Sequence, residues 1–190
     1  MPKYIVFAGP NGCGKSTLYH TNSSYSELPR INVDEIAREN GLDWKNPQHL
    51  LKAGKIAVEK LNACFASLMS FNQETTLCGK SIIRNMEKAK NLGYSIEVYF
   101  VYVDSVQLAK ERIRSRVANG GHGIPDEDVE RRYVESISKL LDVVKLCDKV
   151  EIFDNSKQFV KVISIRKGRE TFVSKNPPLW AKDVLAKILK

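Results

Sequence analysis

The chain lacks any apolar run long enough to span a bilayer, and it lacks clustered cysteines. Its four cysteines, Cys13, Cys64, Cys78 and Cys147, form no C-x-x-C pair, and no His/Cys cluster has the spacing of zinc ligands. Scattered cysteines are typical of a reducing compartment. The apolar stretch from Tyr4 to Gly9 is interrupted at once by further glycines, which indicates a strand and not a signal peptide. We therefore expect a soluble, cytoplasmic protein with no membrane segment.

Internal repeats, low-complexity tracts and breaks in composition are also absent from the 190 residues. Hydrophobic content of 43% and charged content of 27% are ordinary for a globular chain, and the length suits one domain with its own core. The formal net charge of +8 favours anionic partners, such as nucleotides, sugar phosphates, nucleic acid or an acidic protein. Part of this excess is a lysine-rich surface.

Residues 9 to 17 form the most informative motif, because they match the P-loop pattern G-x-x-x-x-G-K-[ST]. The expected nucleotide-binding residues are Gly9, Pro10, Asn11, Gly12, Cys13, Gly14, Lys15, Ser16 and Thr17. The glycines let the backbone turn and aim its N–H groups at an anion, Lys15 can reach the β- and γ-phosphates, and Ser16 can bind Mg²⁺. The strand before the motif and a helix after it would complete a phosphate site.

Apolar strands alternate with helical patterns along the chain, which predicts an α/β fold with a doubly wound, mainly parallel sheet. The expected strands are 3–8, 30–33, 71–77, 95–103 and 150–153. The expected helices begin near Lys15, Pro47, Ser81, Ser105 and Asp126, the last with Asp126 as its cap. Residues 159–166 and 170–173 flank Lys167-Gly168-Arg169 as a β-hairpin, which we expect to extend the sheet before a final helix over 180–189. We expect one domain over residues 1–190, with a core over 3–156 and the hairpin and helix over 157–190.

Carboxylates at strand ends are the candidate catalytic groups, because strand carboxyl ends border the ligand crevice of such sheets. Asp34 ends the second strand, where it could orient and deprotonate an acceptor hydroxyl or simply cap the next helix. Glu74 ends the third strand and could bind an acceptor hydroxyl or hold Mg²⁺ through water. Asp104 follows the strand 95–103, and we interpret it as the cap of the helix before Val106 and not as a metal ligand.

Arginines around a glycine-rich loop predict a mobile lid. Arg112 and Arg116 share one face of a helix, Arg132 begins the helix beyond residues 119–125, and guanidinium groups there would stabilise a phosphoryl group in transfer. We assign function to Arg116 and Arg132, and a solvated surface to Arg114 and Arg131. His122, within the loop, could touch phosphate or have no role.

In this order along residues 3 to 156, the motifs resemble the zeta-toxin family of P-loop kinases. The matching segments are residues 9–17, Ile31–Ala37, Glu74–Gly79, Gly93-Tyr94, Arg112–Arg116, Gly120–Pro125, Arg131–Tyr133 and Phe153–Ser156. The resemblance implies a nucleotide-kinase-like P-loop NTPase fold, ATP and Mg²⁺ as cofactors, and transfer of the γ-phosphoryl group to a small acceptor, for instance a UDP-amino sugar.

By the same resemblance, each candidate residue acquires a role. Asp34 would be the base, Lys15 the phosphate clamp, Ser16 the Mg²⁺ ligand and Glu74 an acceptor contact. Arg116 and Arg132 would be lid residues, and Asn155 would lie near the adenine. Such a protein is expected to act as a monomer and to be blocked by an antitoxin protein.

Two other functions remain open at this point. A polynucleotide or nucleoside kinase would suit the net charge, although no aromatic stacking platform is interleaved with the basic residues, so we do not expect nucleic-acid binding. A non-catalytic ATP-binding module controlled by a protein partner would bind ATP without forming a phosphorylated product.

Overall fold

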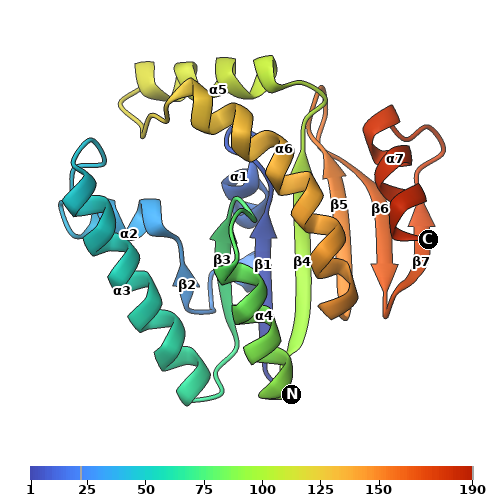
Figure 1. The fold of residues 1–190 in the computed structure, drawn as a ribbon, viewed down its shortest axis with the longest axis horizontal. Helices are drawn as coiled ribbons and strands as arrows, with labels where there is room; N and C mark the ends of the chain where they lie inside the picture. Colours follow the sequence, from blue (N-terminus) through green and yellow to red (C-terminus); the bar gives the residue numbers. More distant parts are fainter. Residues whose placement is uncertain (22, 190) are drawn as a thin grey trace.

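A seven-stranded sheet forms the centre of the computed structural model, which describes residues 1–21 and 23–189 (Figure 1). The strand order is β2-β3-β1-β4-β5-β6-β7. The strands are β1 (Lys3–Ala8), β2 (Arg30–Ile31), β3 (Phe71–Thr75), β4 (Ser95–Tyr102), β5 (Lys149–Asp154), β6 (Val160–Arg166) and β7 (Arg169–Val173). Strands β1 to β5 are parallel to one another, and β6 and β7 add an antiparallel hairpin beside β5. The predicted α/β fold with a mainly parallel sheet and a hairpin extension is confirmed.

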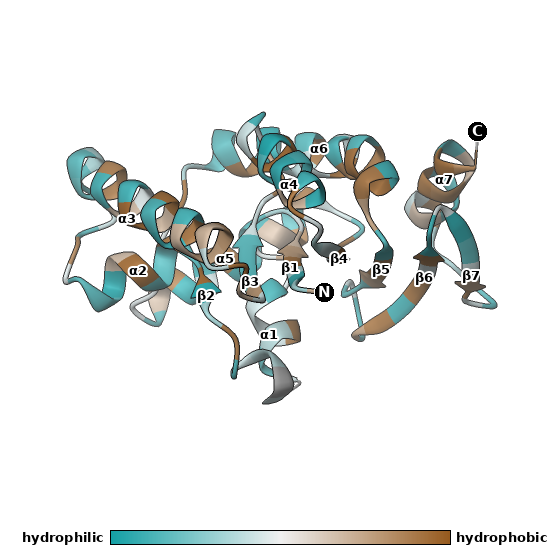
Figure 2. Cartoon of the chain, turned by 90° about the horizontal axis from the view of Figure 1, so that it is seen from below, coloured by the Kyte–Doolittle hydropathy of each residue, from teal (hydrophilic) through white to brown (hydrophobic). Residues whose placement is uncertain are grey.

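Helices cover both faces of the sheet unequally, and Figure 2 shows α3, α4, α6 and α7 on one face and α1 on the other. The helices are α1 (Lys15–His20), α2 (Val33–Glu39), α3 (Pro47–Ala66), α4 (Ser81–Asn91), α5 (Val106–Ala118), α6 (Asp126–Val143) and α7 (Leu179–Ile188), with short 3₁₀ turns at Ser23–Tyr25 and Val144–Leu146. None of those in the described part of the chain has both the length and the apolar content needed to cross a bilayer.

Strand β1 is central because it bonds to β3 on one side and to β4 on the other. Its residues from Tyr4 to Ala8 are all buried, as expected for a parallel strand covered on both faces. Tyr4 and Val6 face the larger core with α3, α4, α6 and α7, whereas Ile5 and Phe7 face a smaller core with α1 and α5. The two cores hold the P-loop end of β1 in a fixed position between them.

Several element boundaries differ from those expected, and hydrogen bonding explains them. Strand β2 is only two residues long, so Asp34 lies in the first turn of α2 and not at a strand end. Ser105 caps α5 by accepting a hydrogen bond from the Leu108 N–H, which corrects the assignment of that cap to Asp104. Asp126 is the first residue of α6 rather than its cap, and its carboxylate pairs with Lys110 and Arg114 of α5.

Candidate active site

The P-loop connects β1 to α1 in a tight turn that only glycine can adopt at key positions. Gly12 and Gly14 have φ angles of 77° and 101°. A Cβ on Gly12 would lie 2.4 Å from the carbonyl oxygen of Ala109 on α5, and one on Gly14 would lie 2.5 Å from Nδ2 of Asn155. That amide donates a hydrogen bond to the Cys13 carbonyl at 2.8 Å. The loop is therefore clamped between α5 and the segment after β5.

Lys15 and Ser16 open α1 inside the P-loop. The Lys15 side chain is buried, and its Nζ donates to the Pro10 carbonyl at 3.0 Å, which curls the loop around the ammonium group. No side chain caps α1 within the described residues, so its first N–H groups face the loop. Gly9, Pro10 and Cys13 are buried beneath and line neither of the cavities described below. Burial raises the pKa of the Cys13 thiol, so it remains protonated.

Glu74 lies directly against the P-loop serine. The Ser16 hydroxyl donates to both carboxylate oxygens, at 3.1 and 3.0 Å, and Nη2 of Arg30 contacts Oε2 at 2.6 Å. Arg30 in turn is held by Glu35 and stacks over the Tyr19 ring at 3.6 Å from its centroid. Arg30 thus fixes Glu74 beside Ser16. The position of Arg30 in the sequence gives no sign of this contact with Glu74.

A cavity of about 340 Å³ extends over the P-loop. Its lining residues come from the loop, α1, α2, α5 and the ends of β3 and β5: Asn11, Gly12, Gly14, Lys15, Ser16, Thr17, Asp34, Glu74, Arg112, Arg116 and Asn155. Backbone N–H groups, an ammonium and two guanidinium groups around one cavity suit a polyphosphate. We call it the phosphate cavity.

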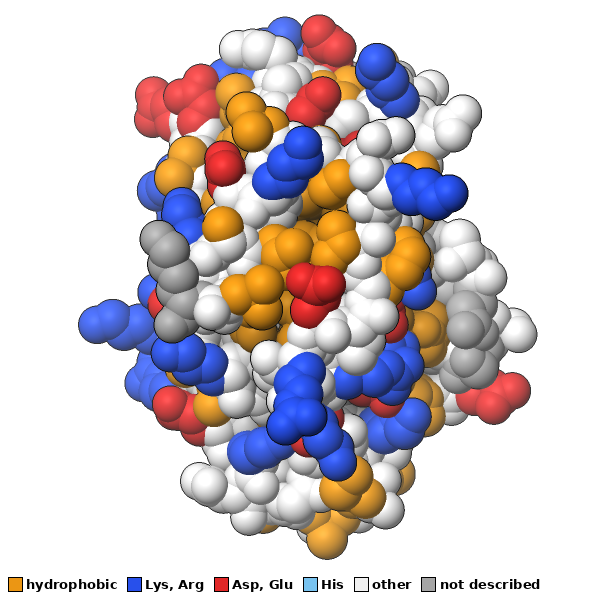
Figure 3. Space-filling model, turned by 90° about the vertical axis from the view of Figure 1, so that its right-hand side faces the viewer, with side chains coloured by type: hydrophobic (Ala, Val, Ile, Leu, Met, Phe, Trp, Pro, Cys, Tyr) orange, Lys and Arg blue, Asp and Glu red, His pale blue; other side chains and the backbone are white. Residues whose placement is uncertain are grey.

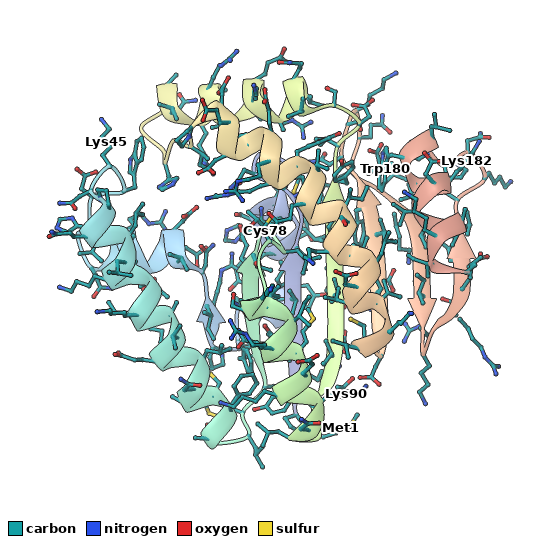
Figure 4. The ribbon with its side chains drawn as sticks, in the orientation of Figure 1. Met1, Lys45, Cys78, Lys90, Trp180 and Lys182 are labelled. Atoms are coloured by element: carbon teal, nitrogen blue, oxygen red, sulfur yellow. The ribbon has the colours of Figure 1, made fainter. Side chains whose placement is uncertain are left out.

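A second cavity of about 530 Å³ adjoins the first, and we call it the acceptor cavity. Its lining is Asn11, Lys15, Asn32, Val33, Asp34, Leu50, Gln73, Glu74, Thr75, Thr76, Cys78, Gly79, His122, Ile124, Arg131, Arg132 and Glu135. Figure 4 places Cys78 in the middle of the molecule, between the upper end of β3 and α6, and its Sγ lies 3.8 Å from the Arg132 carbonyl. Asn11, Lys15, Asp34 and Glu74 line both cavities.

Asp34 owes its place to the start of α2. Asn32 is buried, and its side-chain oxygen accepts hydrogen bonds from the N–H groups of Asp34 (3.0 Å) and Glu35 (3.4 Å). Asn32 is therefore the helix cap, which leaves the Asp34 carboxylate free to face both cavities. Capping of α2 by Asp34 itself, the alternative to a catalytic role, does not occur.

The predicted lid arginines occupy two different cavities. Arg116 lines the phosphate cavity beside Arg112, whose Nη1 is buried without a hydrogen-bond partner among the described residues. Arg132 lines the acceptor cavity and contacts Asn11 (3.4 Å) and Asp128 (3.4 Å). Arg131, expected at the solvated surface, also lines the acceptor cavity.

Loop 119–125, whose His122 and Ile124 line the acceptor cavity, contacts the loop between α2 and α3. The His122 and Trp44 rings lie 4.9 Å apart, and a Cβ on Gly123 would come within 2.8 Å of the Trp44 ring. Burial lowers the pKa of His122, and Arg116 and Arg132 lower it further against the opposing effect of Asp34. His122 is thus neutral near pH 7, and it lies in the acceptor cavity rather than over the P-loop.

Sequence reasoning missed three residues that line or support the site, Arg30, Asn32 and Trp44, and it named Arg112 without assigning a function to it. Asn32 carried a signal, because Asn followed by acidic residues is a helix start. Arg112 carried another, because it lies one turn before Arg116. Arg30 and Trp44 reach the site only through contacts between distant segments.

The chain resembles known proteins in sequence and in fold. No profile of a known protein family matches it. An uncharacterised protein of Haemophilus influenzae is 33% identical to it over 132 residues, which are 69% of this chain and 92% of that protein. A chain in the crystal structure of AvrRxo1-ORF1:-ORF2 with ATP superposes with a TM-score of 0.76 at 15% identity, over 100% of this chain and 64% of that one.

A chain of the PezAT chromosomal toxin-antitoxin system of Streptococcus pneumoniae superposes with a TM-score of 0.58 at 18% identity, over 99% of this chain and 78% of that one. At such identities the likeness shows the fold alone. This chain spans less than two thirds of the matched AvrRxo1 chain. The shared architecture is the mostly parallel α/β fold with a P-loop.

Proposed function

The chain belongs to one family with the uncharacterised Haemophilus influenzae protein, and we propose that it is an ATP- and Mg²⁺-dependent kinase of a small molecule. One observation carries the proposal: the Asp34 carboxylate lines both the phosphate cavity and the acceptor cavity. A group transferred from one cavity to a hydroxyl in the other would pass this carboxylate. A module that only bound ATP would have no need of a second cavity joined to the first in this way.

Each group of residues has a separate role in the proposed phosphoryl transfer. The P-loop N–H groups and Lys15 bind the β- and γ-phosphates of ATP. Asp34 orients the acceptor hydroxyl and takes its proton as the hydroxyl oxygen attacks the γ-phosphorus, while the bond from that phosphorus to the β-phosphate oxygen breaks and ADP leaves. Arg112 and Arg116 stabilise the charge that develops on the transferred group. Because both reactants are held in adjoining cavities, positioning and electrostatics supply the rate enhancement.

Ser16 and Glu74 fit a magnesium ion that is shared with ATP. Their oxygens lie 3.0 to 3.1 Å apart beside the P-loop, and Mg²⁺ is usually held by a hydroxyl or carboxylate together with substrate phosphates and waters. Within residues 1–21 and 23–189, no group of three or more His, Cys, Asp and Glu side chains could hold a metal by itself. Bound there, the ion would neutralise phosphate charge, and Glu74 would act on the metal rather than on the acceptor.

The acceptor cavity supports a hydroxyl-bearing small molecule as substrate. Its volume of about 530 Å³ lies in the range of small-molecule sites, and amide and hydroxyl groups of Gln73, Thr75 and Thr76 line it together with apolar Val33 and Ile124. A UDP-amino sugar combines ring hydroxyls with anionic phosphates and is our first choice. One copy of the chain supplies both cavities, so a monomer suffices.

Control by a protein that covers the P-loop is part of this proposal. The chain matched in Streptococcus pneumoniae comes from a toxin-antitoxin system, and the AvrRxo1 chain was crystallised as an ORF1:ORF2 complex. For this chain, an antitoxin would act in the cytoplasm by blocking entry of ATP.

The experiment is incubation with labelled ATP and a panel of UDP-N-acetylglucosamine, other sugars, nucleosides and oligonucleotides. We expect one class of small molecule to be phosphorylated, and Asp34→Asn to lower the rate by about 10²–10⁴-fold while ATP still binds. Asp142→Asn, which removes an exposed carboxylate paired with Lys139, is the matched control and should leave the rate unchanged. Lys15→Ala should abolish turnover.

Two results would contradict the proposal. If wild-type protein bound ATP but formed no product with any acceptor, a non-catalytic module would be the better reading. If Asp34→Asn kept the full rate, Asp34 would not be the base.

A further inference from the structure

Strand β7 is an open edge of the sheet. It lies last in the strand order, and it pairs only with β6 within the described part of the chain. The other edge, β2, is two residues long and is followed directly by α2, whereas all of β7 from Arg169 to Phe172 is exposed. Phe172 is 42% exposed on this edge, where an unpaired strand offers its N–H and C=O groups to another chain. Figure 3 shows this side of the molecule, with hydrophobic side chains gathered in its middle and Lys and Arg side chains below them.

A row of cations crosses the sheet and ends on β7. The register places Glu97 of β4 beside Lys149 of β5, Lys149 beside Arg166 of β6, and Arg166 beside Arg169 of β7. Residues in register share a face of a sheet, and like charges directly opposite one another destabilise it. Three neighbouring cations in one row are therefore unfavourable unless anions compensate for them.

Anions compensate only the inner end of this row. Lys149 is 4.0 Å from Glu97 and 3.4 Å from Glu151, and it donates to the Tyr99 hydroxyl at 2.9 Å. Among residues 1–21 and 23–189, no ion pair includes Arg166, Lys167 or Arg169. These three cations border a hollow of about 560 Å³ together with Lys149 and the carboxylates of Glu97 and Asp148. Both carboxylates are already paired with lysines, Glu97 with Lys3 and Asp148 with Lys90. The outer end of the row thus borders a hollow in which basic side chains outnumber acidic ones, beside a free strand edge.

We propose that an extended, acidic segment of a partner protein docks on β7 as an eighth strand. Its main chain would pair with the free edge, a carboxylate would continue the row beside Arg169 and Arg166, and an apolar side chain would pack on Phe172. Phe172 lies opposite Ser164 of β6 in the register. The Lys161 Nζ lies over the Phe172 ring, 5.3 Å from its centroid, so an aromatic ring and a cation would both border the docked strand.

This occupant fits the edge better than two others. A second copy of the chain would bring a net charge of +8 toward the same positive row. Single-stranded nucleic acid would need a series of aromatic faces for its bases, and Phe172 is the one exposed aromatic side chain on β7. Strands β4, β5 and β6 separate β7 from β1 and its P-loop, so the inference does not depend on the proposed kinase function.

The test uses the full chain and a fluorescent synthetic peptide of about ten residues, longer than a typical strand, in which Glu alternates with Val and Thr. Fluorescence anisotropy measures binding, and amide NMR shifts with hydrogen exchange locate it. We expect shifts and new protection over residues 169–173, and a loss of affinity of about tenfold or more in Arg166→Glu/Arg169→Glu. Lys52→Glu/Lys55→Glu on α3, with the same change in charge, is the matched control and should bind normally. Phe172→Glu should also weaken binding. The variant should remain folded, because the Phe172 side chain is exposed.

Four outcomes would overturn the proposal. The first is equal binding of a peptide with Lys in place of Glu. The second is tighter, equally arginine-dependent binding of a single-stranded oligonucleotide. The third is a dimer that Phe172→Glu abolishes and that excludes the peptide. The fourth is no binding up to about 1 mM peptide, the weakest affinity expected of a specific contact, in which case the charges serve only to protect the edge from aggregation.

Discussion

Four side chains meet where the two cavities join: Asn11, Lys15, Asp34 and Glu74. Three of them are held by hydrogen bonds: Lys15 donates to the Pro10 carbonyl, Glu74 accepts from Ser16 and Arg30, and Asn11 accepts from Arg132. Asp34 carries no such ion pair in the described part of the chain, which leaves its carboxylate available to a substrate. Of the two carboxylates, Glu74 is paired and Asp34 is not, and for this reason we propose Asp34 as the base.

Arg116 and Arg114 provide a test within one helix. Arg116 lines the phosphate cavity, whereas Arg114 is 65% exposed and paired with Asp126. We expect Arg116→Ala to lower the turnover number by about 10²–10³-fold, because it removes a donor to the transferred group, and Arg114→Ala to leave it nearly unchanged. Steady-state kinetics on the phosphorylated acceptor measure both. Equal losses in the two variants would mean that α5 contributes only general positive charge.

Sequence patterns identify those residues whose chemistry is tied to a local motif. Lys15 and Ser16 were predicted from the P-loop spacing, and Asp34 and Glu74 from their places near the carboxyl ends of expected strands. Arg30 could not be predicted, because its contact with Glu74 joins positions 44 residues apart. The cap of α5 was wrongly predicted because Asp104 and Ser105 are both good caps, and only the packed helix decides between them.

At the scale of elements, the start of α2 matters most to the site. Two N–H groups of its first turn bind the Asn32 side chain, which sets the direction in which Asp34 leaves the helix. Catalytic geometry of this kind tolerates little displacement. The cap therefore acts as a positioning device for the proposed base.

We expect Asn32→Ala to lower the free energy of unfolding by about 1 kcal/mol, the usual cost of a lost cap. It should also lower the turnover number more than it weakens ATP binding, since Asp34 is displaced and the P-loop is not. Asn32→Ser keeps a capping oxygen and should recover both stability and turnover. Urea unfolding and kinetics measure the two effects, and a serine variant as slow as the alanine variant would show that Asn32 acts on the acceptor directly.

At the scale of the whole molecule, loop 119–125 connects the two sides of the acceptor cavity. It follows α5, contributes His122 and Ile124 to the cavity lining, and contacts Trp44 in the loop before α3. Burial lowers the pKa of His122 here, and the neighbouring Arg116 and Arg132 lower it further. Protonation would place a third positive charge among these groups, although Asp34 partly compensates.

This arrangement predicts a pH dependence of stability with a definite sign. Because burial lowers the pKa of His122 in the folded chain, the unfolded chain binds the additional proton, so stability is lost as the pH falls from the unfolded value toward the folded one. We expect the melting temperature to fall less in His122→Asn than in the wild type between about pH 7.5 and about pH 5.5, the range in which histidine titrates. Thermal unfolding followed by circular dichroism tests this, and equal falls in both proteins would refute it.

The overall architecture could be predicted because strand and helix periods alternate clearly along the chain. The P-loop after β1 and the order of later motifs then indicated where the site would form. The contact between Trp44 and His122 could not be predicted in the same way, because no local pattern relates two loops so far apart in the sequence. Distances of this kind are decided by packing alone.

The hydrogen bond from Asn155 to the Cys13 carbonyl has a consequence for the order of events during synthesis. It joins residues 142 positions apart, and β1 itself pairs with strands that begin at Phe71 and Ser95. The nucleotide loop is thus translated early, but its clamp can form only once residue 155 has left the ribosome. Contacts so distant in sequence form late and slow the folding of a chain. A nascent chain cut short before that point would carry the whole P-loop motif and still lack the clamp that shapes it.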